Sequence, residues 1–373
     1  MLTSDVQLPV PEGDAANHSA LLTERIRAAI VASPRRWIDF EQYMDMALYE
    51  PGLGYYAAGA VKLGRQGDFV TAPELTPLFG QFLARQIAPA LARLDQPKVL
   101  ELGPGSGALA EAVLRELGEL GQPIEAYWLL EPSPDLAQRQ SARLDAWQAR
   151  TRWLDRLPTQ PFDGIIIANE VVDALPVTRF QMFNDRLYRV GVGWQDRLCW
   201  QRADVEAATP SYGLPHLLDG YVGEWCPRLE AWIAAVTAQL RRGAVICIDY
   251  GLPASSYYHP DHPDGRLVCH YRHRRHEDPF WWPGLCDISA WVDFSALARA
   301  GQRAGLELAG FTTQAQWLVE GGLEQLLGVA SQADLAAIKT LLLPGEMGEA
   351  FKVMSFSRGT DFELPGRDLR DRL

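Results

Sequence analysis

Three glycines and one acidic residue stand where a short apolar run gives way to a second run of helical character. The run 98–102 has Glu101 as its fourth residue, and Gly103, Gly105 and Gly107 follow. Glycine lets a backbone approach a ligand where a Cβ would clash, and the start of a helix offers N–H groups without partners inside the helix. The segment therefore predicts a strand, a tight turn and a helix that together bind a small ligand.

The spacing of the glycines and the charge of Glu101 narrow the class of ligand. The pattern G-x-G-x-G is not the dinucleotide fingerprint G-x-G-x-x-G, which disfavours an NAD-dependent oxidoreductase. A carboxylate beside the turn would repel a pyrophosphate, whereas it suits a ligand with an ammonium or amino group, such as S-adenosylmethionine (SAM). An ordinary tight turn is the alternative interpretation of the glycines taken alone.

Two later acidic residues stand where the next strands should end. Glu131 closes the apolar run 126–130, and in doubly wound folds an acid at this place hydrogen-bonds ribose hydroxyls. Asp155 follows Leu154, where a third strand should end, and adenine often binds at this place. For each, the alternative is a solvated carboxylate. The runs 164–168 and 244–251 are rich in β-branched residues, which predicts parallel strands buried on both faces.

The composition excludes several classes of function. Of the 373 residues, 47% are hydrophobic and 22% charged, as in an ordinary soluble globular protein, and a net charge of −12 disfavours a general nucleic-acid binder. The five cysteines form no C-x-x-C pair, which predicts reduced thiols and no metal site. No apolar run approaches the roughly 18 residues that span a bilayer. The first twenty residues show no targeting pattern, so we expect a bacterial cytoplasmic protein.

Helical periodicity and turn residues divide the rest of the chain. Asn184 and Asp185 lie between two alternating runs, which predicts a β-hairpin. The long stretch 252–292 shows little periodicity, and such stretches inside compact domains are more often functional than idle. Final strands are expected at 306–311 and 351–356. Helices are predicted over 20–32, 39–48, 78–94, 224–242, 294–305, 321–330 and 332–342.

A series of short segments, in order along almost the whole chain, resembles one family. It is the MidA-type SAM-dependent methyltransferases, whose mitochondrial members are protein arginine methyltransferases that assist assembly of respiratory complex I. Two features depart from its pattern: Val171 and Val172 replace two aromatic residues, and the block 269–282 is unusually basic and rich in tryptophan. The matching segments are 43–49, 54–56, 67–74, 78–80, 101–107, 169–176, 248–251, 271–273, 283–284, 287–289, 292–294 and 347–353.

The resemblance implies an α/β, Rossmann-like fold with a seven-stranded sheet, an N-terminal helical cap and an inserted α+β lobe. It also implies SAM as cofactor and a protein substrate that contains arginine, such as a homologue of a respiratory complex I subunit. The oligomeric state stays open. The expected domains are a flexible tail (1–18), a helical cap with a cofactor loop (19–96), a SAM-binding domain (97–177 and 226–358, with a substrate loop at 252–293), an antiparallel β insert (178–225) and a C-terminal tail (359–373).

Methyl transfer to arginine needs alignment and paired carboxylates, with no metal and no covalent nucleophile. A guanidinium is held by carboxylates in bidentate fashion. Glu170 and Asp173 have this chemistry just past the strand 164–168. We therefore predict them as catalytic residues; the alternative is that Glu170 contacts SAM or caps the next helix.

The remaining site residues are carried by the resemblance. The characteristic loop brings Gly67, Asp68 and Thr71 to the methionine end of the cofactor, although a turn fixed by glycine and proline would explain the same residues. Asn169 joins the cofactor residues. The later block implies substrate residues: Tyr271, Arg272, His273, Asp287 and Asp293.

Three functions remain open on the sequence alone. The first is methylation of a protein arginine. The second is methylation of a small molecule, which the acidic pair at 170 and 173 disfavours. The third is an assembly or interaction protein that binds SAM with little turnover.

Overall fold

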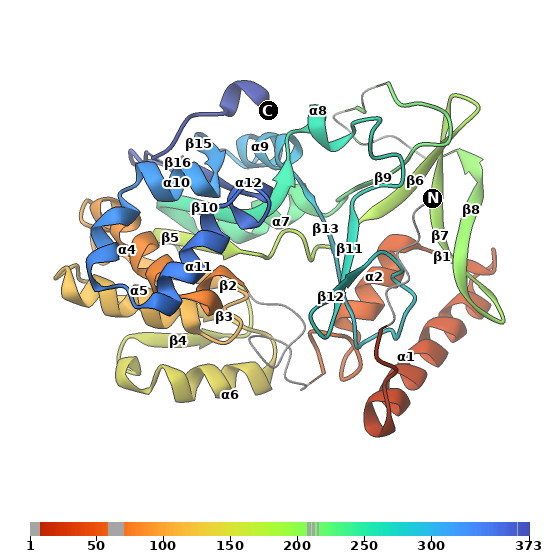
Figure 1. Ribbon diagram of the computed structural model, residues 1–373, viewed down its shortest axis with the longest axis horizontal. Coiled ribbons are helices and arrows are strands. Elements are labelled where there is room, and N and C mark those ends of the chain that lie inside the picture. Colours follow the sequence, from red (N-terminus) through yellow and green to blue (C-terminus); the bar gives the residue numbers. More distant parts are fainter. Residues whose placement is uncertain (1–7, 59–70, 207–209, 211–212, 215, 364) are drawn as a thin grey trace. The chain divides into compact units, whose positions relative to one another are not determined.

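The computed structural model describes residues 8–58, 71–206, 210, 213–214, 216–363 and 365–373 (Figure 1). Its contacts divide the chain into two compact units, each assembled from three segments. The first unit is formed by Met1–Phe69, Ala174–Arg228 and Ser255–Trp291, and the second by Val70–Asp173, Leu229–Ala254 and Val292–Leu373. In the described residues, no helix is long and apolar enough to cross a membrane.

The second unit is built on an eight-stranded sheet with the order β15-β16-β10-β5-β2-β3-β4, and with β14 beside β10. The strands predicted from continuous apolar runs are parallel neighbours, which confirms that part of the prediction. The two final strands are antiparallel and close one side of the sheet. The strands are β2 (Lys98–Leu102), β3 (Ala126–Leu130), β4 (Thr151–Leu154), β5 (Phe162–Asn169), β10 (Leu240–Leu252), β14 (Val292–Asp293), β15 (Glu307–Thr313) and β16 (Phe351–Arg358).

Helices cover both faces of this sheet. Alternate residues such as Val99, Ile165 and Ile246 pack in one core with α4, α5, α10 and α11, while α9 contacts β10 and β15 and packs with α7. Both faces are therefore covered, and so the central parts of these strands are continuous apolar runs, such as residues 165–168 in β5. The helices are α3 (Ala72–Leu75), α4 (Pro77–Leu91), α5 (Ala108–Glu119), α6 (Pro134–Arg143), α7 (Leu229–Thr237), α9 (Phe294–Arg303), α10 (Gln314–Glu320), α11 (Gln332–Leu342) and α12 (Met347–Ala350), with 3-10 turns at Asp145–Trp147, Leu323–Val329 and Arg370–Arg372.

Two glycines allow the central strands to approach closely. A Cβ on Gly164 of β5 would lie 1.9 Å from the carbonyl oxygen of Lys98, and one on Gly243 of β10 would lie 1.7 Å from the carbonyl oxygen of Gly164. Any side chain at these positions would push β2, β5 and β10 apart. These three strands carry the predicted site at their ends, so their spacing sets the geometry of the site.

We expect Gly164→Ala to destabilise the protein by about 3 kcal/mol or more, because the new methyl group overlaps backbone that cannot move away. The matched control is Gly118→Ala in α5, where an added Cβ meets nothing within 4 Å. Loss of a helical glycine there should be neutral or stabilise by about 0.5–1 kcal/mol. Urea unfolding of the two variants measures both; equal stabilities would contradict the role given to Gly164.

In the described part of the chain, the first unit contains two small sheets and the helices α1, α2 and α8. A five-stranded sheet has the order β1-β7-β6-β9 with β8 beside β7, and a second sheet has the order β12-β11-β13. The predicted hairpin is confirmed: Phe183 pairs with Arg186, and Asn184 and Asp185 have φ of 51° and 57° in the turn. The elements are α1 (Gly13–Ala32), α2 (Phe40–Tyr49), α8 (Ala254–Tyr257), β1 (Trp37–Asp39), β6 (Thr178–Phe183), β7 (Arg186–Gln195), β8 (Arg197–Glu206), β9 (Val222–Trp225), β11 (Leu267–Tyr271), β12 (Arg274–His276) and β13 (Asp287–Ala290).

Three sequence expectations differ from the structure. The helix predicted over 321–330 is a 3-10 turn at Leu323–Val329, and the other two differences concern strands. The helix predicted over 224–242 is wrong at both ends, since β9 ends at Trp225 and β10 begins at Leu240, which leaves only α7 between them. The stretch 252–292 contains β11, β12 and β13, and Cys269 and Ile288 share a core with α1 and α2. Contacts therefore group most of it with the first unit rather than with the SAM-binding domain. Tertiary pairing, which periodicity does not report, decides both cases.

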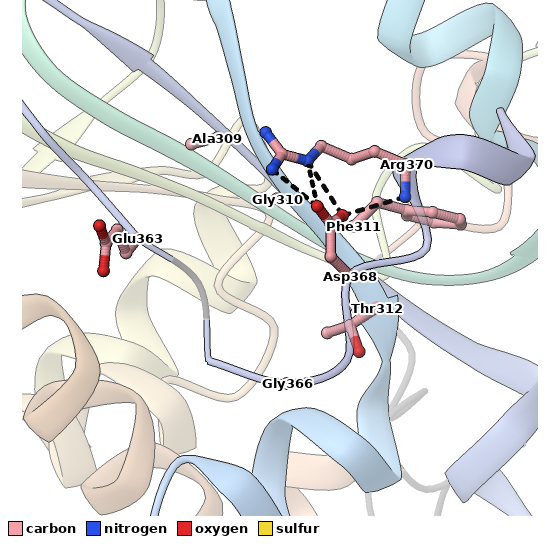
Figure 2. Close-up of a pocket in the computed structure, with 8 residues that line it drawn as sticks. All are labelled: Ala309, Gly310, Phe311, Thr312, Glu363, Gly366, Asp368 and Arg370. Carbon is pink, nitrogen blue, oxygen red and sulfur yellow. Dashed lines mark hydrogen bonds and ion pairs between the residues drawn. The ribbon is translucent and has the colours of Figure 1, made fainter.

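The C-terminal tail covers the outer strand β15. The N–H of Leu369 donates to the carbonyl oxygen of Phe311 at 2.8 Å, and a cavity of about 240 Å³ remains between strand and tail. Figure 2 shows Arg370 paired with Asp368 on one side of this cavity and Glu363 standing apart from them. Covering an edge strand removes a template for pairing with other chains, so we give this tail a structural role. The cavity lies at the sheet edge, and β16 and β10 separate its strand from β5.

Candidate active site

The glycine turn has the geometry that the sequence predicts. Gly103, Gly105 and Gly107 have φ of 58°, 55° and 81°, in the left-handed region that disfavours other residues, and the turn leads from β2 into α5. The N–H of Gly103 donates to the carbonyl oxygen of Leu130 at the end of β3. The turn is thus fixed to the neighbouring strand, with the first turn of α5 following directly.

Glu101 lies inside the protein, just below the turn. It is 2% exposed, and the hydroxyl of Tyr127 donates to its Oε2 at 2.7 Å. Burial raises the pKa of Glu101 to about 7, although the hydrogen bond from Tyr127 opposes this shift. A carboxyl group with this pKa changes charge near neutrality, and a cation bound beside it would favour the ionised form. Its predicted contact with the cofactor stays a prediction.

The raised pKa of Glu101 predicts a pH dependence of stability. The folded protein binds this proton more tightly than the unfolded chain does, so the free energy of unfolding falls as pH rises from about 4.5 to about 7. The shift corresponds to roughly 3 kcal/mol. Glu101→Gln removes the titration, and the difference between wild type and variant should change by about this amount between pH 4.5 and pH 7.5.

Urea unfolding at the two pH values makes the measurement, and Glu119→Gln on the exposed end of α5 is the control. Other buried acids shift both proteins alike and cancel in the difference. A wild-type-minus-variant difference that is independent of pH would contradict the environment given to Glu101.

Glu131 is held from two sides at the end of β3. Its Oε1 accepts the N–H of Ser133 at 2.9 Å, and its Oε2 accepts Nε2 of Gln140 at 3.1 Å. The same Nε2 donates to the carbonyl oxygen of Gly105 at 2.8 Å. The predicted ribose-binding acid is therefore joined to the glycine turn through Gln140, a residue that sequence reasoning missed.

A second set of contacts connects the turn to α3. The hydroxyl of Ser106 donates to Glu74, and Arg143 of α6 donates to the carbonyl oxygen of Ser106 at 3.3 Å. Thr71 is the residue that precedes α3, so the part of the characteristic loop next to α3 lies near the glycine turn. The predicted residues Gly67 and Asp68 lie outside the described residues.

Asp155 follows β4 with its side chain 92% exposed and 3.8 Å from the guanidinium of Arg156. This is the environment of a solvated carboxylate, the alternative that the sequence left open. Contact of Asp155 with adenine stays a prediction. Trp153, two residues earlier, is partly buried, and its Nε1 donates to Oε1 of Gln140 at 2.9 Å.

The ends of β5 and β10 gather three carboxylates. The hydroxyl of Tyr250 donates to Oδ2 of Asp173 at 2.5 Å. Asp249 is fully buried, and burial, followed by the charges of Asp173 and Glu170, raises its pKa well above the ordinary value. Glu170 and Asp173 therefore lie close enough to Asp249 to act on it electrostatically, which supports the predicted pair as parts of one site.

Asp249 fixes the backbone of this site. Its Oδ2 accepts the N–H of Val172 at 3.0 Å and of Asp173 at 3.2 Å, and its Oδ1 accepts the N–H of Tyr250 at 2.9 Å. Sequence reasoning used Asp249 and Tyr250 only as part of a family motif. An acid and a tyrosine at the end of a buried strand were the available signal for a site role.

Glu170, the residue directly after β5, has an unusual backbone conformation. Glu170 has φ of 53°, which is uncommon for a residue with a side chain and costs of order 1–3 kcal/mol. Nδ2 of Asn169 donates to Oε1 of Glu170 at 3.3 Å. Within the described residues, Oδ1 of Asn169 is buried without a hydrogen-bond partner. This acceptor could receive an amino group of a ligand.

The predicted substrate residues fall in different environments. In the first unit, Tyr271 is buried against Trp282, Asp287 accepts the hydroxyl of Tyr56 at 2.9 Å, and Arg272 and His273 are exposed at a hairpin tip. In the second unit, Asp293 caps α9 by accepting the N–H of Ala296 at 3.0 Å. Buried Tyr271, Asp287 and Asp293 thus have structural contacts, and substrate binding by all five stays a prediction.

Comparison with known proteins decides the family. Residues 82–312 match the Methyltransf_28 family of S-adenosyl-L-methionine-dependent methyltransferases. The chain belongs to this family. The relatives include a protein from Drosophila melanogaster named protein arginine methyltransferase NDUFAF7 homolog, mitochondrial, which is 27% identical over 94% of this chain and 88% of its own length. The mouse protein named protein arginine methyltransferase NDUFAF7, mitochondrial, is 28% identical over 84% of this chain and 79% of its own.

Solved structures agree with this assignment. A COG1565 superfamily member from Burkholderia thailandensis, bound to S-adenosyl-homocysteine, is 40% identical with a TM-score of 0.91 and covers 96% of this chain and 99% of its own. A native structure of a COG1565 superfamily protein from the same organism is 38% identical with a TM-score of 0.85, with the same coverage. The Rossmann-like methyltransferase fold predicted from the sequence is confirmed.

The residues present fit SAM. Glycines with left-handed backbone let the cofactor approach the turn, and the unpartnered Oδ1 of Asn169 suits a ligand with N–H groups. Two further acids, Glu101 and Glu131, lie at the neighbouring strand ends, and a ligand with a sulfonium and an ammonium group would favour their ionised forms. The family's SAM dependence and the local chemistry therefore agree.

Proposed function

We propose that this SAM-dependent methyltransferase methylates an arginine side chain of a protein. The single observation that carries the proposal is the gathering of Glu170, Asp173 and buried Asp249 at the ends of β5 and β10. Names of relatives as protein arginine methyltransferases support it at 26–28% identity. A guanidinium is the cation that best matches paired carboxylates, because its planar fork of N–H donors fits them in bidentate fashion.

The carboxylates would hold and orient the acceptor. SAM supplies a methyl group on a sulfonium sulfur, which becomes a neutral thioether as the methyl group leaves. Glu170 and Asp173 would accept N–H groups of the guanidinium and turn one nitrogen toward the methyl group. That nitrogen forms the new N–C bond and then loses a proton, for which a neighbouring carboxylate is the nearest acceptor. Tyr250 would keep Asp173 in place during this step.

The proposal also covers the kind of substrate and the place of the reaction. We infer a protein substrate that presents an arginine in an accessible segment, with a homologue of a respiratory complex I subunit as the first candidate. We also place the reaction in the bacterial cytoplasm. Both statements rest on the resemblance and on the sequence pattern, and the experiment below addresses the substrate directly.

Replacement of Glu170 by Gln should separate binding from chemistry. The variant keeps the size of the side chain and removes its charge, so SAM affinity should change less than about threefold. Methyl transfer should fall by about a hundredfold, because a charged hydrogen bond of roughly 3 kcal/mol is lost in the transition state. The assay transfers labelled methyl from SAM into lysate of a strain that lacks this protein, with mass spectrometry of the labelled band.

Glu324→Gln, an exposed site in the 3-10 turn after α10, is the matched control and should retain full transfer. Label on an arginine side chain supports the proposal. Label on another residue type or on a small molecule would overturn arginine specificity, and unchanged turnover of the Glu170 variant would move the acceptor site elsewhere. Loss of SAM binding would instead place Glu170 in the cofactor site.

A further inference from the structure

Gln140 of α6 is a fully buried polar side chain that connects three strand ends. Its Nε2 donates to the carbonyl oxygen of Gly105 in the turn after β2 and to Oε2 of Glu131 after β3. Its Oε1 accepts Nε1 of Trp153 in β4 at 2.9 Å. A buried amide costs free energy unless all of its groups are bonded, and here they are. The amide therefore belongs to a defined network rather than to a gap in the core.

The network fixes which way the amide points. Nε2 faces two acceptors and Oε1 faces one donor, so a flipped amide would set like groups against each other at all three contacts. Both hydrogens on Nε2 are used. Gln140 consequently has no donor to offer a ligand, and it can act on the cofactor only through the groups that it holds.

The position of α6 brings Gln140 directly against the glycine turn. A Cβ added to Gly107 would lie 3.5 Å from Cγ of Gln140, so the helix rests against the turn itself. In Figure 1, α6 is drawn directly below β4, the strand whose Trp153 contacts Gln140. Oε1 of Glu131 is engaged by the N–H of Ser133, and Gln140 therefore sets the orientation of the second oxygen.

We propose that Gln140 is a positioning residue for the cofactor: it orients the Glu131 carboxylate toward the ribose hydroxyls and ties it to the glycine turn. Because each hydroxyl-to-carboxylate bond depends on direction, a carboxylate that rotates freely would bind the ribose less well. The inference concerns the cofactor alone and is independent of the acceptor that the enzyme methylates.

Titration calorimetry with S-adenosyl-homocysteine tests the proposal. Gln140→Met keeps the length of the side chain and removes all three hydrogen bonds, and it should weaken binding about ten- to a hundredfold. Gln138→Met, two residues away on the exposed face of α6, should bind as wild type does. Thermal unfolding of the apo proteins accompanies the titrations. Wild-type affinity in the Gln140 variant would overturn the proposal.

A double-mutant cycle with Glu131→Ala separates positioning from packing. If Gln140 acts through Glu131, the double variant binds no more than about threefold more weakly than Glu131→Ala alone. The proposal would be overturned if the double variant lost affinity by the product of the two single losses. A Glu131→Ala variant with normal affinity would also overturn it. Should Gln140→Met fail to fold, Gln140→Glu provides the same cycle, since it keeps the shape and sets a carboxylate oxygen against the acceptors on Gly105 and Glu131.

Discussion

The site depends on one buried carboxylate that binds backbone across two strands. Asp249 at the end of β10 accepts N–H groups from the segment after β5 and from its own neighbour Tyr250. These N–H groups would otherwise be buried without partners, at a cost of about 1–3 kcal/mol each. Satisfying them with a carboxyl group rather than a carbonyl oxygen has a consequence: it places a third acidic group beside Glu170 and Asp173. The same interaction thus shapes the loop and sets its electrostatic potential.

Backbone strain accompanies this arrangement. Glu170 adopts a left-handed conformation, and its N–H donates to the carbonyl oxygen of Ile248 on β10 at 2.8 Å. Glycine or asparagine would adopt this conformation with less strain. A glutamate persists there because the surrounding hydrogen bonds hold the chain in place. An observed outlier beside two further acids is consistent with selection for the carboxylate itself rather than for stability.

The sequence predicted the parts of the fold that follow from periodicity. Continuous β-branched runs such as 164–168 identified the parallel strands, and the glycine spacing identified the turn, because each depends on local composition alone. The helix predicted over 224–242 was wrong because pairing of Leu240 with β5 overrides the helical pattern. The strands within 252–292 were not predicted. They pair with one another inside a stretch rich in polar and aromatic residues, where no apolar alternation indicates a strand. In the site, Glu131 was predicted from its place directly after β3 and Asp173 from its place just past β5, and their roles stay predictions. Gln140 was missed, because one glutamine on an amphipathic helix gives no sign of the three groups that it meets after folding.

Burial raises the pKa of a carboxyl group at two places in the site. Below the glycine turn, burial raises the pKa of Glu101 to about 7; at the proposed acceptor site, burial and neighbouring acids raise the pKa of Asp249. Each shift means that the folded protein without ligand holds a carboxyl group in surroundings that disfavour its charge. A sulfonium, an ammonium or a guanidinium placed beside such a group relieves the penalty that burial imposes. Cations are therefore favoured at both places by the field of the site as well as by individual hydrogen bonds. A cofactor that had given up its methyl group would carry a neutral sulfur, and it would lose the part of this stabilisation that depends on the sulfonium charge.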